Sequence, residues 1–180
     1  MTGAERKAIM DMVTAINANF AMQDEAEVNK INEKFIKRFK VDVTRKPDYI
    51  LKLLETAYRE RNSTDVECSL IVAYRYSLFS QEYVSILVRL IESDWHYKHE
   101  DIAFALQKLK SPKAVECLYR TALKRFPYLD YDDAYALAVK CIWALGDTNT
   151  AESREKLKLL SKSDNEIIRE NAIKQIERYQ

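Results

Sequence analysis

A pattern of paired helices recurs along the chain from residue 48 onward. Each unit begins with an apolar stretch of helical spacing, passes a short polar break, and resumes at an acidic residue that opens a second apolar stretch. These acids lie 36, 32 and 33 residues apart and are Asp65, Asp101, Asp133 and Glu166. A fixed period in this range, with two amphipathic helices per unit, is the signature of an α-solenoid. The four predicted helix pairs span residues 48–80, 81–110, 111–147 and 148–180.

Glycine and proline are scarce, with 2 Gly and 3 Pro among 180 residues. Because strands joined by tight turns need such residues, the predicted fold class is all-α. Residues 1–46 carry two further apolar helical faces outside the repeat, which we interpret as a two-helix N-terminal cap. Pro47 disfavours helix in the residue before it and suits the first turn of the next helix. The boundary of the cap is placed there, and residues 47–180 complete one structural domain.

Three stretches carry a family resemblance. In residues 105–118 and 144–151, a helix ending in Ala-Leu passes through a short turn into a new helix, and the second copy keeps Gly146-Asp147. Residues 164–172 resemble an Asp-x-x-Val-Arg-x-x-Ala opening of a second helix. These features resemble HEAT repeats of the phycobilisome-lyase type. The resemblance implies a right-handed HEAT-like α-solenoid with Arg169 bonding neighbouring repeats, but no particular activity.

Sequence motifs of enzymes are missing. The chain has no Gly-x-Ser-x-Gly, no glycine-rich phosphate loop and no His-Glu-x-x-His. Cys68, Cys117 and Cys141 each stand in an apolar helical run, which is typical of small buried thiols in a reducing compartment. We therefore expect a non-enzymatic protein with no cofactor.

His96 and His99 are the only histidines, three residues apart and followed by two acids. A transition-metal site is conceivable from such ligands. No cysteine is near in sequence, however, and short-spaced histidine pairs are common on surfaces. We expect no bound metal.

Two breaks between paired helices are rich in aromatic and acidic side chains. Residues 94–101 carry three acids and one lysine, and residues 127–133 carry three acids and no base. Corresponding breaks of neighbouring repeats line up along one edge of a solenoid, so they are expected to form one ridge. Tyr and Trp dominate interface hot spots, and a negative rim steers a basic partner. The residues predicted to bind a partner here are Asp94, Trp95, His96, Tyr97, Glu100, Asp101, Tyr128, Asp130, Tyr131, Asp132 and Asp133.

Two further partner-binding residues, Tyr74 and Arg75, are expected on the concave face, which second helices usually line. The alternative for the ridge is structural. Its aromatic side chains would then plug the ends of helix pairs, while its acids cap the second helices.

The predicted function is protein binding by occlusion of a macromolecular partner. Its most specific form is a bacterial immunity protein that neutralises a cognate toxin, and a basic nuclease would suit the acidic ridge. Two alternatives stay open. One is nucleic-acid binding or base excision, as in HEAT-like DNA glycosylases, through the basic run 30–46, although 29 basic against 28 acidic residues argue against a dedicated phosphate binder. The other is a scaffold or lyase-like chaperone subunit.

The sequence also predicts a cytoplasmic location. No apolar stretch approaches the roughly 20 residues that a membrane span needs. The apolar stretch 8–22 is interrupted by Asp11, Asn17 and Asn19, unlike the core of a signal peptide.

Overall fold

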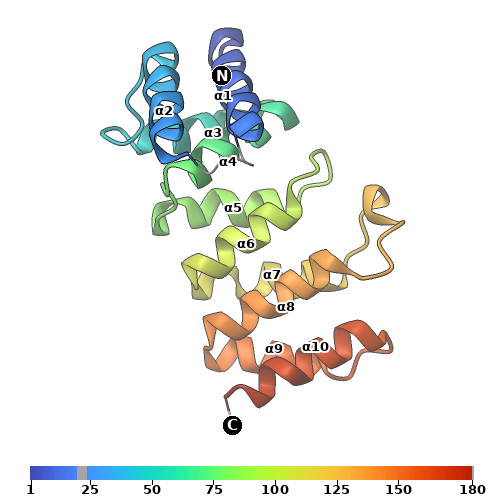
Figure 1. The fold of residues 1–180 in the computed structure, drawn as a ribbon. Coiled ribbons are helices and arrows are strands. Elements are labelled where there is room, and N and C mark those ends of the chain that lie inside the picture. Colours follow the sequence, from blue (N-terminus) through green and yellow to red (C-terminus); the bar gives the residue numbers. More distant parts are fainter. Residues whose placement is uncertain (20–23, 180) are drawn as a thin grey trace. The chain divides into compact units, whose positions relative to one another are not determined.

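All regular elements that the structure describes are helical. The computed structural model describes residues 1–19 and 24–179, which hold ten α-helices, three short 3-10 turns and no strand. The predicted all-α fold class is therefore confirmed (Figure 1). The chain divides into two compact units, Met1–Leu78 and Phe79–Gln180. Residue 180, where the last predicted repeat ends, lies outside the described residues.

Unit 1 (Met1–Leu78) is built from two helix pairs. Its helices are α1 (Gly3–Asn19), α2 (Glu25–Phe39), α3 (Asp48–Glu60) and α4 (Ser63–Arg75). α1 packs on α2, α3 packs on α4, and α1 also contacts α4. Apolar positions at helical spacing fill the space between these helices. Its large buried side chains include Ile9, Met12, Phe35, Phe39, Ile50, Leu54, Val66 and Leu70.

Polar contacts join the predicted cap helices to the first predicted repeat. Asp65 is fully buried and accepts hydrogen bonds from Arg6 of α1, through Nε at 2.5 Å and Nη2 at 3.0 Å. Tyr49 of α3 donates to Glu5 of α1 at 2.5 Å. A buried carboxylate needs such charged partners. Asp65, which was expected to open the second helix of the first repeat, therefore has a structural role as a binding partner of α1.

Unit 2 (Phe79–Gln180) places six helices in two layers. They are α5 (Val84–Ile91), α6 (His99–Leu109), α7 (Val115–Leu123), α8 (Ala136–Thr148), α9 (Ala151–Leu160) and α10 (Glu166–Glu177). In one layer α7 contacts both α5 and α9, and in the other α8 packs against both α6 and α10 (Figure 1). Each helix also packs on its partner in the chain, as α5 does on α6 and α9 on α10. Buried side chains between the layers include Leu87, Leu90, Ile102, Leu106, Leu118, Cys141, Ile142, Leu145 and Leu157.

One predicted helix start is wrong. Asp133 was expected to open a second helix, but α8 begins three residues later, at Ala136. Tyr135 has a left-handed backbone with φ 52°, which interrupts the helix on its N-terminal side. The carboxylate of Asp132 instead accepts from the backbone N–H of Ala134 at 3.1 Å and of Ala136 at 2.7 Å. The acid at the start of α8 is therefore Asp132, the neighbour of the predicted Asp133.

Several helices end on a left-handed residue, a position where glycine is usual. Neither of the two glycines ends a helix in this way. The left-handed residues at helix ends include Lys40, Arg61, Lys110 and Asn149. Gly146 has a packing role inside α8. A Cβ on Gly146 would lie 2.2 Å from Oε1 of Gln175, so the missing side chain lets α10 approach α8 closely.

The three cysteines are buried, as predicted. Burial raises the pKa of Cys68 to about 11 and of Cys117 to about 12, and it raises the pKa of Cys141 as well. Thiols with such pKa values are poor nucleophiles at neutral pH. Among the described residues, no helix combines the length and apolarity needed to cross a membrane.

Candidate protein-binding edge

Two buried histidines shape the loop between α5 and α6. His96 and His99 are fully buried, and their rings stack with centroids 4.3 Å apart. His96 Nε2 lies 2.8 Å from the carbonyl oxygen of Leu90, and His99 Nε2 lies 2.6 Å from that of Ser93. A carbonyl only accepts, so each ring carries its proton on Nε2. The histidines therefore fold the loop back onto the end of α5.

The other ring nitrogens are engaged too. The backbone N–H of Lys98 donates to His96 Nδ1 at 3.1 Å, and the hydroxyl of Tyr128 donates to His99 Nδ1 at 2.7 Å. With their four ring nitrogens bonded, both histidines are neutral structural groups. Burial lowers the pKa of His96, and burial lowers the pKa of His99 to about 4. No group of three or more His, Cys, Asp or Glu suited to a metal ion occurs in the part of the chain that the structure describes.

The hydrogen bond from Tyr128 brings together the two breaks that sequence predicted to be neighbours. Phe126 lies against His99 with ring centroids 3.9 Å apart, and Tyr128 meets Tyr97 edge to face at 5.2 Å. The first break leads into the first turn of α6, and the second lies in the segment between α7 and α8. We call the surface of residues 94–101 and 127–133 the loop edge. Its two histidines and the adjoining Phe126 form a buried base. Tyr128 packs on that base, and Tyr97 packs on Tyr128.

The predicted binding residues divide into exposed and engaged groups. Tyr97 and Tyr131 are 65% and 81% exposed, far more than a large aromatic side chain usually is. Asp94, Asp130 and Asp133 are exposed as well, and within residues 1–19 and 24–179 they form no ion pair. Two tyrosines and three carboxylates thus face solvent together on one edge.

The remaining predicted residues of the edge are held by the protein itself. Glu100 pairs with Lys140 of α8 at 2.7 Å, and Asp101 lies 4.0 Å from Lys98. Trp95 is half-buried with its ring against His96. His96 was predicted to touch a partner, but its complete burial gives it a supporting role instead. Together with the capping role of Asp132, these contacts match the structural alternative for those residues.

Tyr74 and Arg75, predicted to bind on a concave face, lie at the end of α4 in unit 1 and are only half-buried. Arg75 donates twice to Asn32 of α2, from Nε at 3.1 Å and Nη2 at 3.0 Å. These bonds tie α4 to α2. Arg75 therefore has a structural role within unit 1.

A pocket beside the loop edge was not predicted. It encloses about 320 Å³ between the segment that follows α7 and the start of α10. Apolar side chains form much of its wall, and Leu123 on its lining is 50% exposed. Its other apolar lining residues are Ala122, Phe126, Leu129, Leu137, Ala138 and Ile168. Sequence could not reveal this pocket because its lining comes from two stretches, 122–138 and 163–168, that are distant along the chain.

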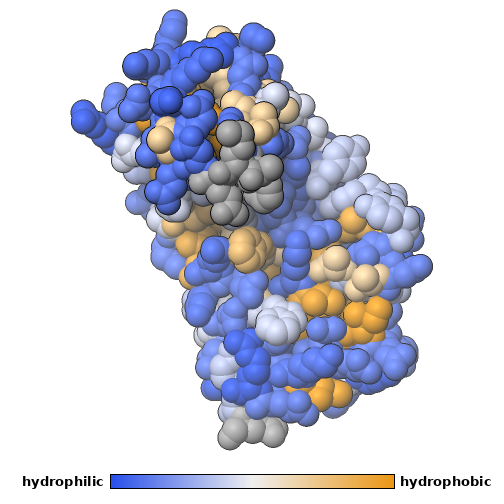
Figure 2. Space-filling model, viewed as in Figure 1, coloured by the Kyte–Doolittle hydropathy of each residue, from blue (hydrophilic) through white to orange (hydrophobic). Residues whose placement is uncertain are grey.

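A second surface was also missed, on the layer of α6, α8 and α10. Phe104 and Trp143 are 43% and 38% exposed there. Trp143 donates to Asn171 Oδ1 of α10 at 3.3 Å, and Arg178 stacks over its ring at 5.4 Å. Figure 2 shows hydrophobic side chains scattered among hydrophilic ones over these helices. In the sequence, both aromatics are indistinguishable from core positions of amphipathic helices.

Comparison with known proteins gives no functional guide, since no protein-family model, curated protein or solved structure matches the chain.

Proposed function

We propose that this protein is a non-enzymatic binding module that uses its loop edge to occlude a basic partner protein. The observation that carries the proposal is the exposure of Tyr97 and Tyr131 beside three exposed carboxylates, which form no ion pair with any other described residue. Tyrosines bury large, rigid area at low entropic cost when they enter an interface, and exposed aromatic clusters mark contact sites. The carboxylates would steer a positively charged partner toward them.

The base of the loop edge supports this role. The His96–His99 stack fixes the backbone on both sides of Tyr97, and Phe126 and His99 pack against Tyr128. A preorganised surface loses less conformational entropy on binding than a mobile one, which favours affinity. The neighbouring pocket of about 320 Å³ offers space for an apolar side chain of the partner.

We further propose that the helices form a HEAT-like α-solenoid of four helix pairs with a two-helix cap. The two layers of unit 2, in which successive helix pairs stack, support that architecture. Buried thiols of raised pKa and fully bonded histidines support a non-enzymatic role, because these groups would otherwise supply nucleophiles or bases. Reduced, buried cysteines also support a cytoplasmic location.

The most specific form of the proposal is an immunity protein that neutralises a basic toxin, such as a nuclease. The test is co-purification of the full chain with the product of the adjacent upstream gene. We expect a stable complex that fails to form when Asp130 and Asp133 are both changed to Lys. Changing Glu152 and Glu177 to Lys, two exposed acids on α9 and α10, is the matched control because it makes the same charge change. No complex with the unmodified chain, or equal loss with the control, would sink the proposal.

The basic run 30–46 keeps nucleic-acid binding open as an alternative. Its cationic side chains are exposed, although Lys30, Arg38 and Arg45 already pair with nearby acids. Titrating labelled duplex at two salt concentrations tests it, since phosphate contacts require a steep salt slope. Binding at low salt with such a slope would favour this alternative over the loop edge.

A further inference from the structure

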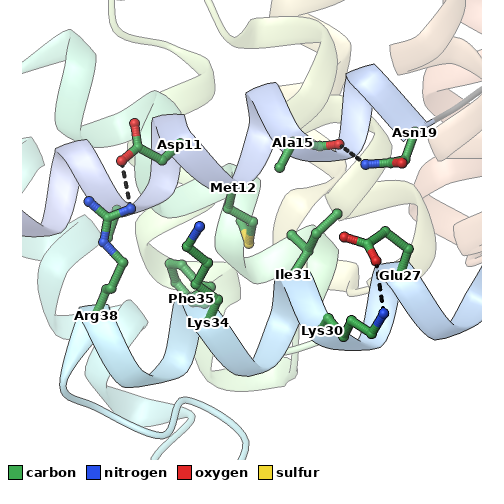
Figure 3. Close-up of a pocket in the computed structure, with 11 residues that line it drawn as sticks. Asp11, Met12, Ala15, Asn19, Glu27, Lys30, Ile31, Lys34, Phe35 and Arg38 are labelled. Atoms are coloured by element: carbon green, nitrogen blue, oxygen red, sulfur yellow. Dashed lines mark hydrogen bonds and ion pairs between the residues drawn. The ribbon is translucent and has the colours of Figure 1, made fainter.

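A groove runs between α1 and α2 in unit 1, and all of its lining residues belong to these two helices. It encloses about 170 Å³. Ala8 and Ala15 line it from α1, and their small side chains leave room opposite α2. Met12, Ile31 and Phe35 point between the helices and form an apolar floor (Figure 3). The groove therefore accepts an apolar side chain along its length.

A row of cations borders this floor. Lys30, Lys34 and Arg38 follow one another at four-residue intervals along α2 and all line the groove. Each interval advances about 6 Å along a helix. The row therefore presents three positive charges, evenly spaced and parallel to the groove axis.

The middle cation is the one available to a ligand. Arg38 pairs across the groove with Asp11 of α1 at 2.7 Å, and Lys30 pairs with Glu27 at 3.2 Å. Lys34 forms no ion pair with another described residue, and Figure 3 shows its side chain reaching toward α1 between those two pairs. The flanking pairs are partly exposed. Exposed pairs of this kind contribute little to stability, so an incoming carboxylate could replace Asp11 or Glu27 easily.

We propose that this groove binds an acidic amphipathic helix of a partner protein. A helix lying along the groove advances by the same 6 Å or so every four residues, so three of its carboxylates match the three cations. Its residues three positions later in sequence lie on the adjoining side, where they meet the apolar floor. A volume of about 170 Å³ is below that of typical small-molecule sites, which favours inserted side chains over an enclosed metabolite. This is the helix-in-groove mode of recognition.

The proposed groove is independent of the loop edge. It lies in the other unit and carries the opposite charge, so it selects an acidic segment where the loop edge selects a basic one. The two proposals can therefore fail separately.

A designed peptide tests the proposal on the full chain. The probe is a labelled 15-residue helix of Ala and Gln, with three Glu four positions apart and Leu three positions after the first two Glu. Binding is measured by fluorescence anisotropy at low and moderate salt. We expect saturable binding that weakens about tenfold or more in Lys34→Glu. Lys37→Glu makes the same charge change on the same helix outside the groove lining, and should weaken binding less than about twofold.

Two further arms separate shape from charge. Ala15→Phe fills the groove without changing its charge and should abolish binding, while circular dichroism verifies that the helices persist. A peptide of the same composition in scrambled order should bind at least about tenfold more weakly. Absence of binding, equal effects of Lys34→Glu and Lys37→Glu, or unchanged binding by Ala15→Phe would each overturn the proposal. So would preferential binding of phosphatidylserine vesicles over the peptide, which would assign the groove to a lipid surface.

Discussion

Acidification should destabilise unit 2 through His99. Burial lowers the pKa of this imidazole to about 4, whereas an unfolded chain has a histidine pKa near 6.5. Between these two values the unfolded chain binds a proton that the folded chain excludes, so unfolding becomes easier as pH falls. The difference of about 2.5 pH units corresponds to about 3 kcal/mol lost between pH 6.5 and pH 4. Above pH 7 the contribution of His99 is complete and stability should not depend on its titration.

The groups around His99 decide how cleanly this effect can be seen. Its ring faces His96, Phe126 and Tyr128, and Lys124 and Asp94 act on it through their charges. Burial lowers the pKa of His96 as well, which adds to the same loss on acidification. Protonation of either ring would place a cation in an apolar site, where it lacks compensating solvent.

The assay uses the two tryptophans of the chain, Trp95 and Trp143, which both lie in unit 2. Urea unfolding followed by tryptophan fluorescence therefore reports the free energy of unfolding of that unit. It is measured at pH 7.5, 6.0, 5.0 and 4.5 in the unmodified chain and in His99→Gln. The glutamine can still donate to the carbonyl of Ser93, but it does not titrate.

We expect His99→Gln to be less stable at pH 7.5 and to lose less stability on acidification than the unmodified chain. Carboxylates titrate in both proteins and cancel from the comparison. A histidine NMR titration of the unmodified chain gives the pKa directly. A His99 pKa near 6.5, or parallel pH profiles for the two proteins, would refute the account of a buried neutral imidazole.

Three further predictions concern packing and helix ends. Gly146→Ala should destabilise unit 2 by about 1 kcal/mol, because the clash of the new Cβ with Gln175 outweighs the better helix propensity of alanine. In a double-mutant cycle read by tryptophan fluorescence, Gln175→Ala should remove that penalty. Lys110→Gly should stabilise unit 2 by about 1 kcal/mol, because Lys110 ends α6 with a left-handed φ of 49°, which glycine adopts without strain. Lys108→Gly, within the helix, should destabilise unit 2 by a similar amount. Tyr76→Phe should leave the free energy of unfolding unchanged or raise it by up to about 1 kcal/mol, because the buried hydroxyl of Tyr76 has no hydrogen-bond partner among the described residues. A lower melting temperature of the variant, measured by circular dichroism, would contradict this.

The helices of this protein were predictable because local sequence specifies them. Apolar positions at helical spacing, few glycines and the polar break before Glu166 placed α10 at its observed start. The meeting of residues 94–101 with residues 127–133 was also expected from the repeat, and Tyr128 bonding to His99 satisfies that expectation. Whether the loop edge binds a partner stays a prediction.

Burial within the loop edge was less predictable. His96 and Tyr97 are adjacent in a polar segment, yet one is fully buried and the other is 65% exposed. The difference arises because the carbonyl of Leu90 and the backbone N–H of Lys98 satisfy the His96 ring, which no local pattern indicates. The start of α8 was missed for a similar reason. Tyr135 adopts a left-handed backbone that its own sequence does not favour.

The central claim is that exposed Tyr97 and Tyr131 form the centre of a protein-binding surface. Calorimetric titration of the upstream gene product into the full chain tests it most directly, with Tyr97→Ser/Tyr131→Ser as the variant. The control is Leu159→Ser/Ile173→Ser, which removes two exposed apolar side chains from α9 and α10. Each interface tyrosine removed should cost about 2 kcal/mol, so the double variant should bind about 10³-fold more weakly while the control binds normally. A double variant that binds as tightly as the unmodified chain would contradict the claim.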